Sequence, residues 1–276
     1  MTQPPILVTG GTGILGSLVV PRLRATGREI RVMSRKARDS EPGVQYVVGD
    51  LVSGDGVDAA VTGVGTIVHL AGTAKGDAQK TERLVQAARG AGASHLVYIS
   101  VVGADRIPVV GFGRLPFAYF ASKRAAEQVV MNSGLPWTAL RATQFHELIE
   151  IVCKGLNKLP VAPIPAGFRF QPVDADAVAA RLVELALGEP AGQVPDIGGP
   201  RVYRLVDLFR SYLRATKRRK AVLPVWIGGK TARVIRGGAN LLEGTTGSGT
   251  TWEDWLEERV SGGRRARESV PAAPQR

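Results

Sequence analysis

The sequence predicts an α/β fold with a doubly wound parallel sheet and a small C-terminal lobe. Two observations carry this prediction. Residues 1–100 alternate short apolar runs with segments of helical periodicity, which is typical of right-handed βαβ crossovers. The first apolar run, residues 6–9, leads into a glycine-rich turn and then into an amphipathic segment. Ligands of such sheets bind at the carboxyl ends of the strands, so we expect the site there.

Three glycines, Gly10, Gly13 and Gly16, occupy that first turn with the spacing G-x-x-G-x-x-G. Gly10 allows a tight turn, Gly13 lets the backbone approach phosphates at the positive end of the helix, and Gly16 lets helix and strand pack closely. An ordinary glycine-rich turn is the alternative, but the βα pattern that follows favours dinucleotide binding. The expected cofactor contacts here are Gly10, Thr12, Gly13, Ile14 and Leu15.

The second predicted strand, residues 29–35, ends without the acid that accepts hydrogen bonds from the ribose hydroxyls of NAD. Arg35 and Lys36 stand there instead, between Ser34 and Arg38. A guanidinium binds a 2′-phosphate that a carboxylate would repel. We therefore expect NADP as the cofactor, with a solvated basic loop as the alternative interpretation.

The third and fourth predicted strands, residues 44–48 and 66–70, end in two further candidate turns. Asp50 can accept from an adenine amino group or cap the next helix. The small residues after His69 would let the chain pass close under a cofactor. His69 itself lies in an apolar run and is expected to be a packed, hydrogen-bonded histidine rather than a catalytic one. The expected cofactor contacts here are Asp50, Leu51, Leu70, Ala71 and Gly72.

A helix predicted over residues 116–132 carries Tyr119 and Lys123 at i and i+4, so both lie on one face. An ammonium beside a phenol favours the phenolate, and we expect it to lower the pKa of Tyr119. Such a phenol is a candidate general acid near neutral pH. No metal site is expected.

The formal charge of +12 suggests anionic ligands such as a phosphorylated cofactor. The basic residues look scattered apart from runs at 217–220 and 264–267, and no aromatic residues interleave with these runs. We therefore expect no nucleic-acid partner. No segment has the ~18 apolar residues of a membrane span, so no membrane partner is expected. The first residues lack the features of a signal peptide, and the single cysteine, Cys153, favours a cytoplasmic location.

Several stretches together resemble a known family. They are V-T-G-G-T-G-I-L-G at 8–16, G-D-L at 49–51, Y-x-x-x-K at 119–123, G-L-P-W-T-A-L-R-A-T at 134–143, V-D-A-D-A-V-A at 173–179 and I-G-G-P at 197–200. Over residues 1–215 the chain resembles the short-chain dehydrogenase/reductase superfamily, and within it the atypical, NmrA-like NAD(P)-binding branch. This branch includes members that bind NAD(P) without turning over a substrate.

The resemblance implies roles for particular residues. A Tyr gives or takes the proton, a Lys binds the nicotinamide ribose and tunes the Tyr, and a Ser or Thr holds the substrate carbonyl. Tyr119 and Lys123 match, but Val101 and Val102 stand where the family usually has the Ser. Ser100 is instead expected to face the cofactor. The chain after the sixth strand passes beside the nicotinamide in this family. This implies a cofactor contact at Ala142 and substrate contacts at Val101, Gln144, Phe145 and His146.

We therefore expect one Rossmann-type NAD(P)-binding domain over residues 1–260. Residues 143–172 and 200–260 would form most of a substrate lobe, with 147–172 as one wall of an apolar pocket. Residues 261–276 are expected to be a disordered tail. The predicted function is an NADPH-dependent, ketoreductase-like oxidoreductase that reduces a carbonyl of an apolar or aromatic small molecule. A non-catalytic NADP-binding redox sensor is the alternative, which the missing Ser favours, and an isomerase or epimerase comes third. The sequence indicates no oligomeric state.

Overall fold

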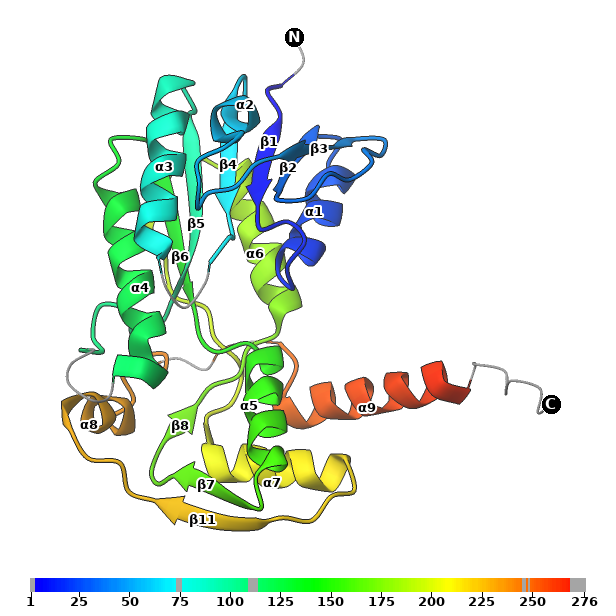
Figure 1. Ribbon diagram of the computed structural model, residues 1–276, viewed down its shortest axis with the longest axis vertical. Coiled ribbons are helices and arrows are strands. Elements are labelled where there is room, and N and C mark those ends of the chain that lie inside the picture. Colours follow the sequence, from blue (N-terminus) through cyan, green and yellow to red (C-terminus); the bar gives the residue numbers. More distant parts are fainter. Residues whose placement is uncertain (1–2, 73–75, 109–113, 245–246, 248, 269–276) are drawn as a thin grey trace.

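A seven-stranded parallel sheet forms the centre of the molecule (Figure 1). The computed structural model describes residues 3–72, 76–108, 114–244, 247 and 249–268. The strand order is β3-β2-β1-β4-β5-β6-β9, so the order reverses between β1 and β4. The strands are β1 (Ile6–Thr9), β2 (Ile30–Ser34), β3 (Val44–Val48), β4 (Thr66–His69), β5 (His95–Val101), β6 (Trp137–Ala142) and β9 (Gly192–Gln193). The predicted Rossmann-type, doubly wound α/β fold is confirmed.

Helices cover both faces of the sheet, because its central strands are apolar on both sides. Every residue of β1, β4 and β5 is buried. Within β1, Ile6 and Val8 face one core, whereas Leu7 faces the other. The first core is closed by α1 (Gly16–Ala25) and α6 (Ala175–Leu187). The second is closed by α2 (Val57–Val61), α3 (Asp77–Gly90) and α4 (Arg114–Met131).

A C-terminal lobe lies beyond the carboxyl ends of the main strands (Figure 1). Its helices are α5 (His146–Lys158), α7 (Leu205–Ala215), α8 (Lys230–Arg236) and α9 (Trp252–Glu268). Two small sheets pair β8 (Arg169–Phe170) with β10 (Tyr203–Arg204), and β7 (Val161–Pro165) with β11 (Ala221–Val225). Ile149, Phe209, Trp252 and Leu256 are buried together, so the lobe has a core of its own.

The end of the chain differs from the prediction. Helix α9 continues to Glu268, eight residues into the segment expected to be disordered from residue 261. Trp252 and Leu256 anchor its first turns in the lobe core, and no proline interrupts it before Pro271. Arg, Ala and Glu have high helix propensity, so a helix that is anchored at its start can continue through residues 264–268, although Gly262 and Gly263 oppose it. Residues 269–276 lie outside the described part of the chain.

The positive charge is not scattered, which corrects the sequence-based interpretation. Residues 201–236 contain eleven of the 36 lysines and arginines of the chain and one acidic residue, Asp207. All of these residues belong to the C-terminal lobe, which therefore has a strongly basic surface. Within the described residues, no helix combines the length and apolar character needed to cross a bilayer.

Candidate active site

The glycine turn between β1 and α1 leaves no room for a side chain at Gly10 or at Gly16. Gly10 has a φ of +70°, and a Cβ atom there would lie 2.7 Å from the backbone nitrogen of Ala71. A Cβ atom on Gly16 would lie 2.2 Å from the carbonyl oxygen of Gly10. These contacts agree with the turn and packing roles that the spacing predicts. The turn therefore lies directly against the chain that follows β4.

The outer rim of this turn is open. Thr12, Gly13 and Ile14 are exposed, whereas Leu15 is buried in the first core. Among the described residues, no partner accepts a hydrogen bond from the backbone N–H of Thr12 or Ile14. The first turn of α1 contains no acidic residue that would repel an anion. These features fit a pyrophosphate at the start of α1.

Arg35 and Lys36 directly follow the second strand, β2, which ends at Ser34 beside β1 and its glycine turn. Strand β2 pairs with β1 as far as Thr9 and Met33, so the residues that follow it continue along the same edge. Both side chains are exposed, and neither forms a salt bridge within the described part of the chain. Both cations are thus free to meet an anionic group of a ligand, and they equally fit a solvated basic loop.

Asp50 caps its own turn after β3. Its Oδ1 accepts the backbone N–H of Val52 at 2.7 Å, and its carbonyl oxygen accepts the N–H of Gly54. Leu51 is 5% exposed, and its carbonyl oxygen accepts from Arg83. Asp50 does not cap the next helix, α2, whose N-cap residue is Gly56 and which has no side-chain cap hydrogen bond. The second carboxylate oxygen of Asp50 is the atom left for an adenine contact.

The chain after β4 connects the glycine turn to helix α4. Ala71 touches the turn at Gly10, and a Cβ atom on Gly72 would lie 2.9 Å from Lys123 Nζ and 3.1 Å from Asp77 Oδ2. The absence of a side chain at Gly72 thus leaves room for the lysine. The carboxyl end of β4 and the lysine of α4 consequently lie in contact at the point where the strand order reverses.

Lys123 is buried among aromatic and acidic groups. Its ammonium donates to the carbonyl oxygen of Ile99 at 3.2 Å and lies 3.8 Å from Asp77 Oδ2. It also lies 5.1 Å from the ring centre of Tyr98 and 6.0 Å from that of Tyr119. Burial lowers the pKa of Lys123, and the Asp77 carboxylate partly opposes this effect. The structure therefore brings Tyr119 and Lys123 together, as their spacing predicts.

The expected lowering of the Tyr119 pKa is wrong. Burial, with a smaller contribution from the Asp77 carboxylate, raises the pKa of Tyr119 to about 12. Lys123 has a carboxylate beside it, so its positive charge acts on the phenol less than an isolated ammonium would. Tyr119 is consequently protonated at neutral pH, which is the form that can donate a proton.

His69 is a packed histidine, as the sequence predicts. Its Nδ1 lies 2.7 Å from the Thr9 hydroxyl and its Nε2 lies 3.1 Å from the Thr81 hydroxyl. Because Thr81 donates its proton to the carbonyl oxygen of Asp77, His69 Nε2 carries the ring proton. Burial lowers the pKa of His69 to about 3. The neutral ring thus connects β1 to α3 through hydrogen bonds with Thr9 and Thr81.

Ser100 does not offer its hydroxyl to a cofactor, which corrects the prediction. The hydroxyl donates to Glu127 Oε2 at 2.7 Å, and Arg141 forms a salt bridge with the same carboxylate. Glu127 is fully buried and continues the α4 face of Tyr119 and Lys123 by one turn. Val101 and Ala142 are both nearly fully buried and pair with each other between β5 and β6.

Three nearby residues were not predicted. The i+4 spacing from Lys123 could have identified Glu127, whereas Asp77 and Tyr98 approach the lysine only through the packing of α3 and β5.

The predicted substrate residues lie in the interior of the lobe and its junction with the sheet. Gln144 donates to the carbonyl oxygen of Asn240 and accepts from the N–H of Gln171, so its amide is already engaged. Phe145 is half-buried against the first core. These two residues are thus held by the protein itself.

His146 does not lie at the substrate position expected for it. It is fully buried, and its ring stacks 6.0 Å from that of Trp252 and 5.4 Å from that of Trp255. Neither ring nitrogen has a hydrogen-bond partner within the described residues, and burial lowers the pKa of His146 to about 4. The tryptophans of α9, far away in the sequence, exclude it from a substrate position.

The predicted apolar wall over 147–172 is also only partly correct. Ile149 packs into the lobe core, but Leu148, Ile151 and Val152 are exposed to solvent.

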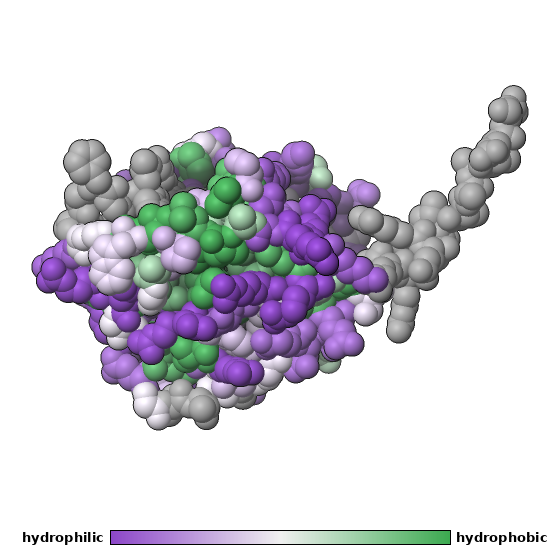
Figure 2. All heavy atoms as spheres, turned by 90° about the horizontal axis from the view of Figure 1, so that it is seen from below, coloured by the Kyte–Doolittle hydropathy of each residue, from purple (hydrophilic) through white to green (hydrophobic). Residues whose placement is uncertain are grey.

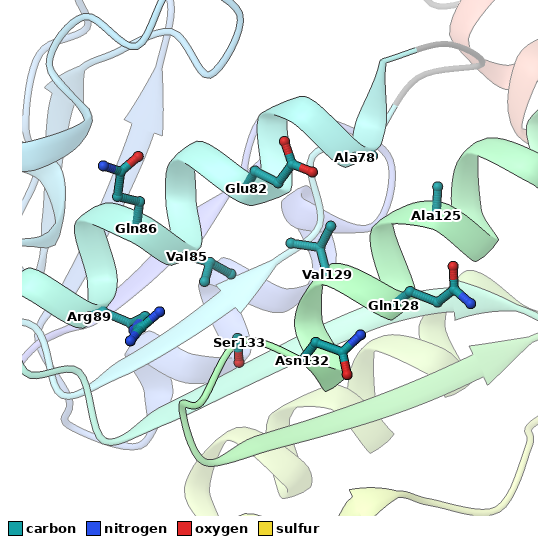
Figure 3. A pocket seen from close by; sticks show the side chains of 10 residues that line it. All are labelled: Ala78, Glu82, Val85, Gln86, Arg89, Ala125, Gln128, Val129, Asn132 and Ser133. Atoms are coloured by element: carbon teal, nitrogen blue, oxygen red, sulfur yellow. The ribbon is translucent and has the colours of Figure 1, made fainter.

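A surface hollow lies elsewhere, between α3 and α4, and mostly polar side chains line it (Figure 3). It is on the outside of the helix layer, so it is not the predicted site. In the described residues, no group of three His, Cys, Asp or Glu could hold a metal ion.

Comparison with known proteins agrees with this geometry. A family model described as NAD(P)H-binding matches residues 10–150. An NAD(P)H azoreductase of Xenophilus azovorans is 29% identical over 203 residues, which cover 71% of this chain and 68% of the relative. A 3-beta-hydroxysteroid dehydrogenase of Mycolicibacterium neoaurum is 30% identical over 198 residues, or 56% of this chain and 54% of the relative. This chain thus spans about half the length of that second relative.

A solved structure shares the fold. A short-chain dehydrogenase/reductase superfamily protein from Agrobacterium tumefaciens with bound NAD superposes with a TM-score of 0.67 at 20% identity, covering 96% of this chain and 98% of the other. The matched family segment begins at Gly10 and ends in α5, so it contains the glycine turn, Gly72, Tyr119 and Lys123. The protein belongs to the NAD(P)H-binding family and has the fold of the short-chain dehydrogenase/reductase superfamily.

Proposed function

We propose that the protein is an NADPH-dependent, ketoreductase-like oxidoreductase that reduces a carbonyl of an apolar or aromatic small molecule. The observation that carries this proposal is an unbroken series of contacts at the carboxyl ends of the strands. The glycine turn touches Ala71, Gly72 adjoins Lys123, and the Lys123 ammonium lies over the ring of Tyr119. A cofactor on the turn would thus have a proton donor at its far end.

The residues present fit NADPH. The exposed backbone of Thr12, Gly13 and Ile14 would hold the pyrophosphate, and Arg35 with Lys36 would hold the 2′-phosphate. Asp50 would accept from the adenine amino group. Leu70, Ala71 and Gly72 would pass beneath the nicotinamide half, where Lys123 would contact the ribose. When bound, NADPH supplies the hydride.

Tyr119 would supply the proton. Its raised pKa keeps the phenol protonated at neutral pH, so it can give a proton to the oxygen of a carbonyl as that oxygen becomes negative. Lys123 would orient the ribose and stabilise the negative charge left on Tyr119. The names of the two relatives, an azoreductase and a 3-beta-hydroxysteroid dehydrogenase, support redox chemistry on a largely apolar substrate. The buried single cysteine supports a cytoplasmic location.

A second function is favoured by the surroundings of Ser100. Its hydroxyl is engaged by Glu127, and the two valines that follow are buried. The serine hydroxyl at the end of β5 is therefore not free to hold a substrate carbonyl, which favours a non-catalytic NADP-binding redox sensor of the NmrA-like type. Such a sensor would bind NADPH and consume none of it.

Consumption of NADPH over a panel of quinones, polycyclic ketones and azo compounds tests the proposal. A reductase should oxidise NADPH with at least one of these acceptors, and the Tyr119→Phe variant should do so much more slowly. Calorimetry on the same preparation measures NADPH binding. Tight binding without consumption across the panel would contradict the reductase and support the sensor.

A further inference from the structure

The small sheet of the C-terminal lobe has an outer face that is apolar at every position. Strands β7 and β11 pair in parallel, with Val161 opposite Ala221 and Leu223 opposite Pro163. The alternate residues Ala162 and Ile164 are buried and pack into the lobe core. Since side chains alternate across a strand, the opposite face consists of Val161, Pro163, Pro165, Ala221, Leu223 and Val225. A sheet with one solvent face ordinarily places polar residues there.

Side chains of this face are well exposed, and Leu159 and Trp226, next to the two strands in the chain, are exposed as well. Leu223 is 55% exposed, and Trp226, directly after β11, is 71% exposed. Leu159 and Val161 are more than 40% exposed at the other strand. Figure 2 shows this end of the molecule, where hydrophobic side chains gather across the surface between hydrophilic ones. We call the outer face of β7 and β11, together with Leu159 and Trp226, the apolar face.

Cations border the apolar face at both ends. The run Lys217-Arg218-Arg219-Lys220 leads directly into β11, and Lys220 Nζ donates to the carbonyl oxygen of Leu159. At the other end, the Arg236 guanidinium lies 4.0 Å from the ring centre of Trp226. Within the described residues, no salt bridge engages any of the seven cations between positions 217 and 236. No carboxylate of the described residues therefore neutralises their charge, and five of them, Lys217, Arg218, Arg219, Lys230 and Arg233, are exposed to solvent.

We propose that the apolar face docks on the surface of an anionic lipid bilayer. Cations would contact the negative headgroups, while Leu223, Trp226 and Val161 would enter the boundary between headgroups and acyl chains. Trp suits this boundary because its ring is apolar and its N–H is polar. A peripheral contact of this kind needs no membrane-spanning segment, so it is compatible with the lack of such a helix among the described residues.

Other occupants fit the apolar face less well. A second copy of the chain would bring two strongly basic surfaces together, which is unfavourable. Addition of a strand at the free edges is hindered because Pro163, Pro165 and Pro224 have no N–H to donate. Nucleic acid would satisfy the cations, but Leu223 and Val161 offer its bases no stacking surface.

Flotation with lipid vesicles tests the proposal. The wild type should float with vesicles of phosphatidylcholine and phosphatidylglycerol at low salt and remain behind with phosphatidylcholine alone. The pair Leu223→Asn and Trp226→Asn should abolish flotation. The pair Arg218→Gln and Arg219→Gln should weaken binding about 30-fold, since each cation near the surface contributes about 1 kcal/mol.

Matched controls separate this face from the rest of the surface. Leu187→Asn with Met131→Asn removes two exposed apolar residues from the main domain, and Arg24→Gln with Arg89→Gln removes two exposed cations there. Both controls should float like the wild type, and circular dichroism melting should show every variant folded. Equal flotation of the wild type and the Leu223/Trp226 variant would overturn the proposal. The proposal would also be overturned if the wild type were a dimer and the Leu223/Trp226 variant a monomer. Binding of the wild type to DNA but not to vesicles would overturn it as well.

Discussion

Two kinds of charged residue define the site at the scale of single side chains. Lys123 is buried with a carboxylate 3.8 Å away and two aromatic rings around it. Arg35 and Lys36 are exposed at the end of β2. The buried cation is fixed in place and suited to orient a reacting group, whereas the exposed cations can move toward an incoming phosphate.

Arg35→Asp should change the choice of cofactor. The substitution removes a charge-assisted hydrogen bond to the 2′-phosphate and adds repulsion, so NADPH affinity should fall by about 1–3 kcal/mol, while NADH affinity should hold or rise. Isothermal calorimetry measures both. Arg89→Asp, an equal charge change on α3, is the control and should leave both affinities unchanged. A wild type that binds the two cofactors equally would contradict the assignment.

At this scale the sequence predicts what local geometry determines. Tyr119 and Lys123 share a face because they are four residues apart in a helix, and His69 is recognisable from its apolar run. The acid beside Lys123 comes from α3, and the rings around His146 come from α9. These contacts depend on how distant elements pack, so the pKa of Tyr119 and the position of His146 were predicted wrongly.

At the scale of elements, the glycine turn is the feature that most restricts the sequence. It joins β1 to α1 so tightly that Gly11 and Gly16 have no space for a Cβ atom. A Cβ atom on Gly11 would lie 2.7 Å from Val32 of β2. The turn is therefore held by both neighbouring elements, which keeps its exposed rim in one conformation.

Gly16→Ala should destabilise the protein and impair cofactor binding. The new Cβ would meet the rigid backbone carbonyl of Gly10 at 2.2 Å, and we expect a loss of about 1–3 kcal/mol in unfolding free energy, as for an overpacked core. Urea unfolding and calorimetry with NADPH measure the two effects. In Gly90→Ala nothing lies within 4 Å of the new atom, so this control should be neutral or slightly stabilised. Equal stability of the two variants would show that the turn relaxes freely.

The strands were the most predictable elements. Continuous apolar runs mark the parallel strands of the main sheet, and the glycine spacing marks where the first helix starts. The lobe was less predictable because its strands are short and its sheet has an apolar outer face. The length of α9 could not be predicted from its polar second half, since Trp252 and Leu256 in its first half anchor it.

At the scale of the whole molecule, the C-terminal lobe lies beyond the carboxyl ends of the main strands. Its packing includes a buried, neutral histidine, His146. His146 begins α5 and stacks on both tryptophans of α9. Its ring lies in the interior, and the uncharged form is the one that burial favours. Protonation of His146 in acid should therefore destabilise the packing of α5 on α9.

Unfolding free energy should fall as pH decreases from 6.5 to 4. The unfolded chain binds a proton at His146 near pH 6.5, whereas the folded chain does so only near pH 4. The unfolded state thus gains protons first, and up to about 3 kcal/mol of stability is lost across this window. His146→Phe keeps a ring between the tryptophans and should make this dependence less steep, while His69, whose pKa burial lowers to about 3, still contributes over the same window and down to about pH 3. Urea unfolding at a series of pH values checks this, and an unchanged slope in the variant would contradict it.

Single-turnover reduction of an accepted ketone tests most directly whether Tyr119 donates the proton in a reduction by NADPH. The wild type, Tyr119→Phe and Lys123→Ala are compared at saturating NADPH. Phenylalanine retains the ring packing and removes only the hydroxyl, so turnover should fall about 10²–10⁴-fold with NADPH affinity nearly unchanged. Lys123→Ala should reduce both. A Tyr119→Phe enzyme as fast as the wild type would show that the proton comes from another group.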